Sequence, residues 1–422
     1  MIKEYRSLGE SLYIETLDNG LKILVSVKPG FNSKTAFFAV NYGSVMQNFT
    51  LGEKLIKSPA GVAHFLEHKL FDNPDGSVDG AFALNGASPN AFTSYDMTAY
   101  HFDCTDNFDA NLSTLLSFVM TPYFTEESVA KERGIIEQEI RMWEGRMSSV
   151  NLSNLYSCMY ENHPVATPIL GTKQSISEIT ADTLYTCHSA FYNPSNMALT
   201  VAGDVDPQAV FDAARALTPA GFAEKALPDY GHPEVLAPIK SRVTKDADVS
   251  APQLVFGCKV MPKEGSALLR ASLVSEIALG AVFGKSSPFY TTLYKSGMIR
   301  VGFSSYIDYL PGTGMFLAGC ESPEPDRVLE SFAQTLQNIR ENGIDKRDLL
   351  RVKAATYGYK LRSLESFDSI CYDLADAAFC GYEPLSEFAL FDSIDSDECS
   401  RFICDNILSD NLAVSVLMPK SN

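Results

Sequence analysis

Two patterns of apolar residues alternate along this chain of 422 residues. Short runs of alternating or continuous apolar residues predict β-strands, and longer stretches with helical spacing predict helices between them. The clearest strand signals are Lys22–Val27, Thr35–Val40, Leu254–Val260 and Met315–Cys320. Short strands separated by long helices indicate an α+β fold, in which helices pack on a largely antiparallel sheet.

The two halves of the chain end with the same order of predicted elements. A helix that starts at Ile179–Leu184 leads to the strand Asn196–Val201, and a helix that starts at Ile394–Cys399 leads to the strand Asn411–Val416. The offset between the two pairs is about 215 residues. Similarity at a fixed offset indicates a duplication, so we predict two sequence-related domains.

A chain of this length exceeds one ordinary hydrophobic core, which favours two domains. The stretch from Pro219 to Pro238 contains proline and glycine and is polar enough to be a linker. We therefore predict a first domain at residues 1–220, a linker at 221–238 and a second domain of the same fold at 239–422.

One segment of the first half carries the residue types of a zinc site. His64, Glu67 and His68 form an H-x-x-E-H pattern, and such positions on a helix fall within about 100° of arc. Two imidazoles can hold one zinc ion, which lowers the pKa of its bound water toward about 7. Glu67 can then act as the general base and pass the proton to a leaving amine. The pattern also fits a buried helix with two hydrogen-bonded histidines, so further ligands must decide.

The flanking sequence predicts a helix around this motif. Ser58 offers an N-cap hydroxyl, and Pro59 suits the first helical position, where no donor is lost. Apolar residues on the flanks of the His/Glu stripe should anchor the helix in a core. They are Val62, Phe65, Leu66 and Leu70.

A second predicted helix can supply the third protein ligand that catalytic zinc sites usually have. It follows Thr125 as N-cap, with acidic residues in its first turn, and runs to Trp143. Glu132 and Glu139 are seven positions apart and share one face. Either can ligate zinc or hold a ligand histidine; the alternative is a solvated acidic face.

Together these motifs resemble the signature of the pitrilysin/insulinase family of zinc peptidases, also called inverzincins. From His68 to Glu139 the gap is 71 positions. Further segments that match the family are Asn41–Ser44, Gly61–Ala63, Gly86–Tyr100, His163–Pro164 and Phe191–Met197. The resemblance implies two α/β roll domains per chain, each a largely antiparallel sheet packed against helices.

The resemblance also implies a role for each site residue. His64, His68 and Glu139 correspond to the ligands of one Zn²⁺ per chain. Glu67 corresponds to the general base, and Glu132 to an acidic residue that orients a ligand histidine. Mixed imidazole and carboxylate ligands with an open position suit zinc, although manganese or cobalt could occupy such a site.

A strand after a Ser-Pro-Asn turn is predicted from the alternation of Ala91, Thr93 and Tyr95. In the family, the equivalent edge strand pairs with the peptide substrate through backbone hydrogen bonds. The resemblance therefore implies substrate contacts at Asn90, Ala91 and Phe92. An ordinary buried strand is the alternative for any one of them.

The second half carries no H-x-x-E-H motif, so the chemistry is expected in the first half. The family has an Arg and a Tyr seven positions apart that stabilise bound substrate. Here Tyr294 stands at the Arg position and Arg300 near the Tyr position, with the loop one residue shorter, which leaves their substrate-binding role open against a structural one. The segment Gly280–Ser286 has three residues between its glycines where a phosphate-binding loop needs four, so it predicts no nucleotide site.

Charge and cysteine usage bear on partners and compartment. The net charge of −18 argues against nucleic acid and anionic membrane surfaces as partners. No run of eighteen apolar residues and no signal-peptide core are present. Nine cysteines without a C-x-x-C pair indicate reduced thiols, so we predict a cytoplasmic protein.

These observations predict a zinc-dependent endopeptidase that hydrolyses unfolded peptides. One alternative is a dedicated maturation peptidase that removes a leader with the help of a partner subunit; another is a non-catalytic scaffolding subunit of the same fold. The length resembles that of half-size family members, whose cleft closes only when two subunits face each other. That resemblance implies a homodimer, or a heterodimer with an inactive relative.

Overall fold

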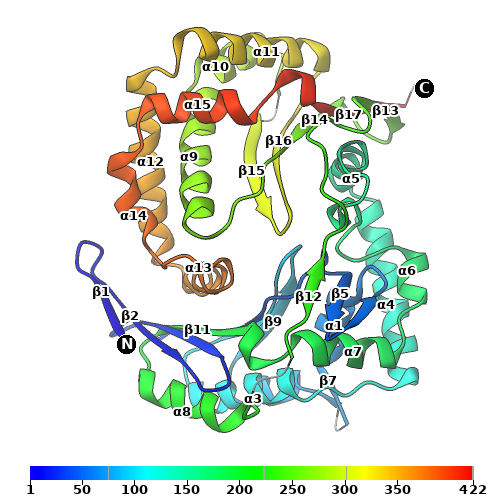
Figure 1. Cartoon of the computed structure of the whole chain (residues 1–422), viewed down its shortest axis with the longest axis vertical. Helices are drawn as coiled ribbons and strands as arrows, with labels where there is room; N and C mark the ends of the chain where they lie inside the picture. Colours follow the sequence, from blue (N-terminus) through cyan, green and yellow to red (C-terminus); the bar gives the residue numbers. More distant parts are fainter. Residues whose placement is uncertain (75, 222–223, 301, 421–422) are drawn as a thin grey trace. The chain divides into compact units, whose positions relative to one another are not determined.

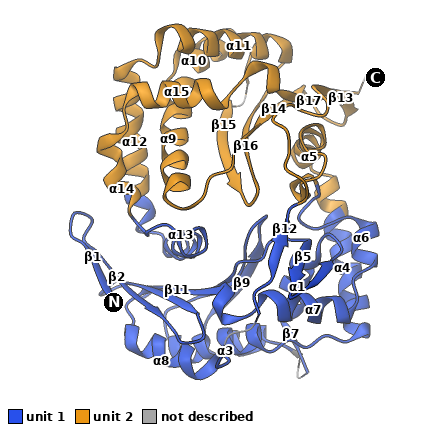
Figure 2. Ribbon diagram, viewed as in Figure 1, with its two compact units in different colours: residues 1–140, 167–230, 361–385 blue, residues 141–166, 231–360, 386–422 orange. Residues whose placement is uncertain are grey.

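The computed structural model describes residues 1–74, 76–221, 224–300 and 302–420. Contacts divide the chain into two compact units, each assembled from three stretches of sequence (Figures 1 and 2). Unit 1 comprises residues 1–140, 167–230 and 361–385; unit 2 comprises residues 141–166, 231–360 and 386–422.

This division departs from the predicted contiguous domains in two segments. Residues 141–166 precede the predicted domain boundary but belong to unit 2, and residues 361–385 follow it but belong to unit 1. Sequence order therefore does not decide which sheet these segments pack against.

The main sheet of unit 1 has seven strands in the order β1-β2-β3-β11-β4-β10-β9. Among the described strands, β3 and β11 run parallel and the other neighbours are antiparallel. Strand β9 forms one edge, because it pairs with β10 alone. The strands are β1 (Ile2–Tyr5), β2 (Glu10–Thr16), β3 (Lys22–Val27), β11 (Met197–Gly203), β4 (Lys34–Val40), β10 (Thr98–Cys104) and β9 (Ser88–Thr93).

Two small sheets complete the strands of unit 1. One has the order β12-β5-β6, and the other pairs β7 with β8. Their bounds are β12 (Leu227–Asp229), β5 (Asn48–Leu51), β6 (Lys54–Lys57), β7 (Asp72–Asn73) and β8 (Gly76–Ser77). Strand β12 lies inside the predicted linker 221–238, so part of that segment is structured; residues 222 and 223 of it lie outside the described residues.

Helices cover both faces of the unit 1 sheet. Tyr100 of β10 contacts Phe118 of α3, with ring centroids 5.7 Å apart, whereas Ala99 packs in a cluster with Leu374 of α13. Successive side chains of a strand point to opposite faces, so α3 and α13 lie on opposite sides of the sheet. The helices are α1 (Val62–Leu70), α2 (Asp79–Leu84), α3 (Phe108–Met120), α4 (Glu126–Glu144), α6 (Lys173–Ser177), α7 (Ala181–Phe191), α8 (Pro207–Leu217) and α13 (Phe367–Cys380).

Unit 2 repeats the arrangement with five strands in the order β13-β17-β14-β16-β15. Strands β13 and β17 are parallel and the other pairs antiparallel. This order and these directions equal those of β3-β11-β4-β10-β9 in unit 1, which confirms two related α+β domains. The strands are β13 (Arg242–Ala247), β17 (Ala413–Pro419), β14 (Gln253–Val260), β16 (Thr313–Glu321) and β15 (Ser304–Leu310).

One helix from each half of the chain packs on the sheet of the other half. Helix α13 lies against β11 and β4, and α5 lies against β17 and β14, which are the equivalent strands. The remaining helices are α9 (Gly265–Phe283), α10 (Pro288–Lys295), α11 (Pro325–Asn342), α12 (Lys346–Ser363), α14 (Glu387–Leu390) and α15 (Ser396–Asn406), with α5 at Met147–Met159. The exchange of α5 and α13 explains why the units are not contiguous.

Helix α9 is long and apolar enough to cross a membrane by length and composition alone. Its residues from Leu273 to Phe283 supply much of the unit 2 core, where Phe283 stacks on Phe332 with ring centroids 4.8 Å apart. Its charged residues are paired, since Arg270 binds Glu398 at 2.7 Å. The apolar composition of α9 is therefore explained by burial in this core.

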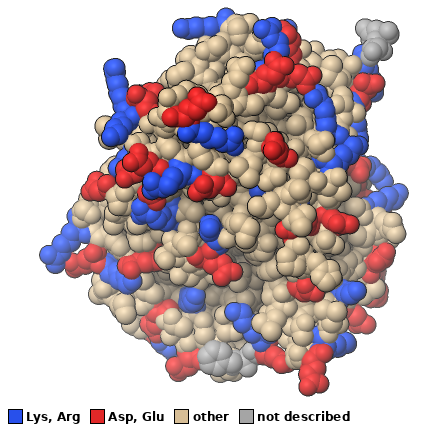
Figure 3. Space-filling model, turned by 45° about the horizontal axis from the view of Figure 1, so that its top comes forward, with Lys and Arg blue, Asp and Glu red and all other residues tan. Residues whose placement is uncertain are grey.

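Charges of both signs are interspersed on the face drawn in Figure 3. The acidic excess of the composition is thus spread among basic side chains there. All nine cysteines lie among the described residues as free thiols, as their scattered spacing predicts.

Candidate active site

Helix α1 carries the H-x-x-E-H motif but starts later than predicted. It begins at Val62, after Gly61 in the left-handed conformation (φ 93°), so the prediction of Ser58 as N-cap was wrong. The Ser58 hydroxyl instead donates to the carbonyl oxygen of Gln47 at 2.7 Å. A Cβ atom at residue 61 would lie 2.5 Å from the Leu170 carbonyl oxygen, so a glycine is required here.

The rest of the α1 prediction is confirmed. Its four predicted anchor residues are at most 2% exposed, and they fix the helix against α7, β9 and β10. These residues are Val62, Phe65, Leu66 and Leu70. A buried anchor on each side of the stripe holds the histidines in one orientation.

Helix α4 begins where predicted and brings two glutamates to α1. The Thr125 hydroxyl accepts a hydrogen bond from the Ser128 backbone N–H at 3.1 Å, which is an N-cap. Glu139 Oε2 lies 3.6 Å from Nε2 of His64 and 3.6 Å from Nε2 of His68. One carboxylate oxygen thus faces both imidazoles.

The three facing atoms have the spacing of a metal site. The ligand atoms of His64, His68 and Glu139 all lie within 4.8 Å of one another. A four-coordinate zinc ion with bonds of about 2.0–2.1 Å holds its ligand atoms about 3.3 Å apart, close to the 3.6 Å contacts. Two imidazoles and one carboxylate leave a fourth position open, so these residues fit catalytic zinc.

The two histidines are supported unequally. His68 Nδ1 lies 2.9 Å from Glu132 Oε1, whereas Nδ1 of His64 is buried and has no hydrogen-bond partner among the described residues. Burial lowers the pKa of His68, but the Glu132 contact and the charges of Glu67, Glu132 and Glu139 outweigh it, so the pKa lies above its ordinary value. The His68 ring therefore contacts Glu132 through Nδ1 and faces Glu139 with Nε2.

The hydrogen-bond partner of the Glu67 carboxylate lies on a strand, β9. Glu67 Oε2 accepts a hydrogen bond of 2.5 Å from the hydroxyl of Thr93, the last residue of β9. The carboxylate of Glu67 also acts on two buried tyrosines, Tyr100 and Tyr192. Burial raises the pKa of both, and the negative charge of Glu67 raises both further. The sequence placed Thr93 on a strand, but nothing in it showed that this strand end lies beside α1.

Strand β9 differs from its prediction at both ends. It runs from Ser88 to Thr93, so the predicted turn residues belong to the strand and Tyr95 lies beyond it. The Ser94 N–H donates to the Met97 carbonyl oxygen at 2.7 Å. Because paired and unpaired residues alternate along an antiparallel pair, the backbone groups of Ala91 and Thr93 face the open edge.

The three predicted substrate contacts lie on this edge strand. The side chain of Asn90 accepts a hydrogen bond from the Ala91 N–H at 2.9 Å. The ring of Phe92 lies on the face of the sheet opposite to the Thr93 side chain, toward Tyr372 of α13, with centroids 5.9 Å apart. Their role in binding a peptide stays a prediction.

The other two predicted contacts belong to unit 2. Tyr294 lies on α10, is 59% exposed and stacks on Tyr290 with centroids 6.0 Å apart. The backbone N–H of Arg300 donates to the carbonyl oxygen of Glu321 at 3.3 Å. Their predicted part in substrate binding is likewise a prediction.

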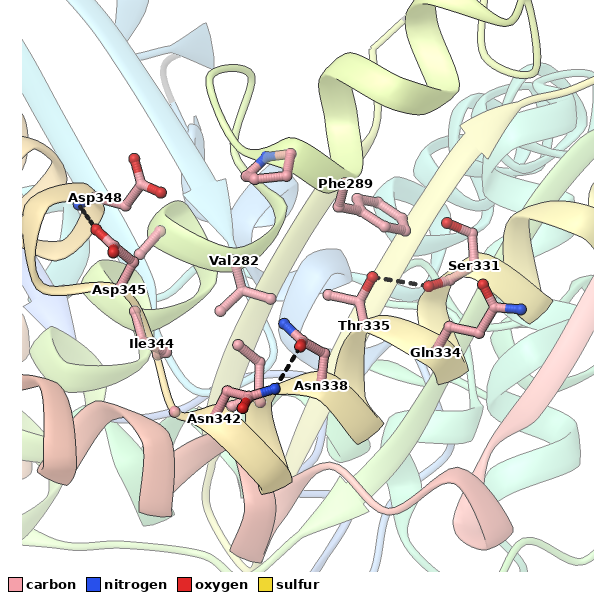
Figure 4. A pocket seen from close by; sticks show the side chains of 14 residues that line it. Val282, Phe289, Ser331, Gln334, Thr335, Asn338, Asn342, Ile344, Asp345 and Asp348 are labelled. Atoms are coloured by element: carbon pink, nitrogen blue, oxygen red, sulfur yellow. Dashed lines mark hydrogen bonds between the residues drawn. The ribbon is translucent and has the colours of Figure 1, made fainter.

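A separate cavity of about 430 Å³ lies in unit 2 between α9, α10 and α11 (Figure 4). Its labelled side chains include amides and hydroxyls from α11, along which Asn342 donates to Asn338 at 2.8 Å. The residues that line it include Asp345 and Asp348 but no histidine or cysteine. This lining offers no ligand set like that on α1 and α4.

An inverted histidine–glutamate motif on one helix, with a glutamate from a second helix beside it, is typical of one class of metal-dependent peptidases, the inverzincins. Residues 55–173 match the family model described as insulinase (peptidase family M16), and residues 178–356 match that of the peptidase M16 inactive domain. The chain is 37% identical to the zinc protease YmfH of Bacillus subtilis over 436 aligned residues, which cover 100% of both chains. It therefore belongs to the M16 (insulinase) family of peptidases.

Solved structures agree with this assignment. An M16-like peptidase from Alicyclobacillus acidocaldarius superposes with a TM-score of 0.93 and 31% identity, covering 97% of this chain and 99% of the other. Pitrilysin superposes with a TM-score of 0.79 and 17% identity, covering 100% of this chain but 46% of the pitrilysin chain. The fold of the whole chain therefore corresponds to about half of pitrilysin.

Proposed function

We propose that this protein is a zinc-dependent endopeptidase that hydrolyses unfolded peptides. The observation that carries the proposal is the convergence of His64, His68 and Glu139 at ligand spacing, with Glu67 beside them. Relatives that carry the name zinc protease support the same metal. The intact ligand set argues against a purely scaffolding role.

Zinc in this site would polarise the scissile carbonyl and make water a stronger nucleophile. Glu67 serves as general base, and the hydrogen bond from Thr93 to Oε2 leaves the other carboxylate oxygen to take the proton. Glu132 keeps the His68 ring in place. Each of these side chains is held by a hydrogen bond to a residue of another element, so little reorganisation accompanies the reaction.

The open edge of β9 supports a preference for unfolded substrates. Ala91 and Thr93 direct backbone groups outward, and Thr93 also contacts Glu67. A peptide that adds to this edge as a strand passes the catalytic glutamate with its main chain extended. A segment inside a folded protein cannot do this, because its backbone groups are already paired.

We further propose that the chain works as a pair in the cytoplasm, with one catalytic zinc ion in the site on α1 and α4 of each chain. The correspondence to about half of pitrilysin supports a second chain, either another copy or an inactive relative. Free cysteines throughout the chain support a reducing compartment.

The test is hydrolysis of an unstructured quenched peptide by wild type and Glu67→Gln, each with and without zinc. Loss of the base should lower the rate by on the order of 10²–10⁴ while zinc stays bound. Glu127→Gln, an exposed change in the first turn of α4, serves as the control and should keep the wild-type rate. A wild type that binds no zinc, or a Glu67→Gln variant with full activity, would overturn the proposal.

A further inference from the structure

A second cluster of metal-ligating side chains lies in unit 1, apart from the residues on α1 and α4. His101 and Asp103 are two positions apart on β10 and share a face of the sheet. Asp368 reaches them from the first turn of α13. One ligand atom from each residue lies within 4.8 Å of the other two, and His101 Nδ1 is 3.8 Å from Asp368 Oδ1.

The imidazole of His101 is held in place but not satisfied. Its ring packs on Phe37 with centroids 4.4 Å apart, and its side chain is 11% exposed. Its Nδ1 atom is buried and has no hydrogen-bond partner among the described residues. Buried nitrogens without a partner are rare in folded proteins, so this atom points to a ligand.

The 3.8 Å between His101 Nδ1 and Asp368 Oδ1 is too long for a hydrogen bond, so no direct hydrogen bond links these two residues. Burial holds the pKa of His101 below its ordinary value, although the charges of Asp368 and Asp103 raise it. Burial, and then the charge of Asp103, raise the pKa of Asp368. The ligand atoms of one imidazole and two carboxylates thus lie within 4.8 Å of one another, where a cation can bind all three.

The cluster has space for an ion with water ligands. A cavity of about 350 Å³ lies beside it, with His101 and Asp368 in its lining. Aromatic rings form the rest of one wall, from Phe37, Phe92 and Tyr372. Asp103 is anchored from the neighbouring strand by the Thr35 hydroxyl, so one carboxylate is fixed while Asp368 is free to adjust.

We propose that His101, Asp103 and Asp368 bind a second divalent transition-metal ion, Zn²⁺ or Mn²⁺. One imidazole with two carboxylates suits these ions better than Mg²⁺, which prefers oxygen ligands alone. The site joins β10, from the first half of the chain, to α13, which the second half contributes to this sheet. Its role is therefore to fasten the exchanged helix, and it stands independently of the catalytic proposal.

The test compares metal content in the full chain after loading with Zn²⁺ or Mn²⁺ and removal of free ion. Wild type should hold two equivalents, and Asp368→Asn and His101→Asn should each hold one. Asp373→Asn removes another carboxylate of the same cavity lining and should keep two. Asp368 is largely exposed, so its replacement leaves the fold intact even where His101→Asn does not.

Two further readouts make the result decisive. Added Mn²⁺ should raise the melting temperature of wild type and of Asp373→Asn, and that shift should shrink in Asp368→Asn, because binding to the folded state stabilises it. Mg²⁺ should produce no such difference between the variants. One equivalent in wild type, or two equivalents retained in Asp368→Asn, would overturn the proposal.

Discussion

The two units share one sheet plan but use the same position in it differently. In unit 1, helix α1 contacts the edge strand β9, and in unit 2, helix α9 contacts the equivalent edge strand β15. Helix α1 places two histidines and a glutamate there, whereas the buried residues of α9 are apolar apart from Ser275. The same position beside an edge strand is thus occupied in unit 1 by a helix with potential metal ligands and in unit 2 by a helix of the hydrophobic core.

The two units resemble independent domains, but neither comes from one contiguous half of the chain, because α5 and α13 are exchanged. Helix α13 buries Phe367, Ile370 and Leu374 against the unit 1 sheet. At about 1.5–3 kcal/mol per buried side chain, their loss is comparable to the whole stability of about 5–15 kcal/mol of an ordinary domain.

We therefore expect the largest effect from separating the halves. A fragment of residues 1–230 should show no cooperative thermal unfolding by circular dichroism, and a peptide of residues 361–385 added in trans should restore it. A peptide of the same composition in scrambled order is the control. Cooperative unfolding of the fragment alone would show that the exchange is dispensable.

Substitutions in the core should distinguish α1, which carries the potential metal ligands, from α9, which carries none. Ile277→Ala on α9 and Leu66→Ala on α1 each truncate a side chain with no exposed area, so each should cost about 2–5 kcal/mol of unfolding free energy in urea. Leu66→Ala should also weaken zinc binding, measured by competition with a chromophoric chelator, because it loosens the motif helix. Equal weakening by Ile277→Ala would break the comparison.

The next largest effect is expected from removing the contact between Glu132 and His68. Glu132→Gln removes the charge beside Nδ1 of His68 and should lower zinc affinity by about 10–100-fold. Glu137→Gln, on the same helix but facing Lys173 at 3.9 Å, is the matched control and should bind zinc as wild type does. Unchanged affinity in Glu132→Gln would remove its assigned orienting role.

The smallest effect is expected at the strand end. Thr93→Val removes the hydrogen bond to Glu67 and should lower kcat on the order of tenfold with little change in KM, since hydrogen bonds to charged groups contribute about 1.5 kcal/mol or more. Thr93→Ser keeps a hydroxyl and should restore most of the rate. A rise in KM alone would mean that Thr93 binds substrate rather than the base.

Local signals in the sequence predicted the α+β fold class and many of its helices and strands correctly. Thr125 was predicted correctly as an N-cap from the acidic residues of the first turn, and the N–H that its hydroxyl binds belongs to Ser128, only three residues later. Ser58 was misassigned because its hydroxyl binds Gln47, which lies eleven residues earlier in the chain. Likewise, the contact between Thr93 and Glu67 depends on how a strand end meets a helix, which periodicity does not encode. The sequence of α13 gave no sign that this helix packs on the sheet of the first half of the chain.

An open edge strand can also pair with unwanted partners, including other copies of the same strand. Strand β9 limits that risk in its own sequence. Pro89 has no N–H to offer on this strand, and the side chain of Asn90 already occupies the N–H of Ala91. A visiting strand must displace an internal hydrogen bond before it can pair. The edge of β9 therefore disfavours the long, cooperative strand pairing from which aggregates grow.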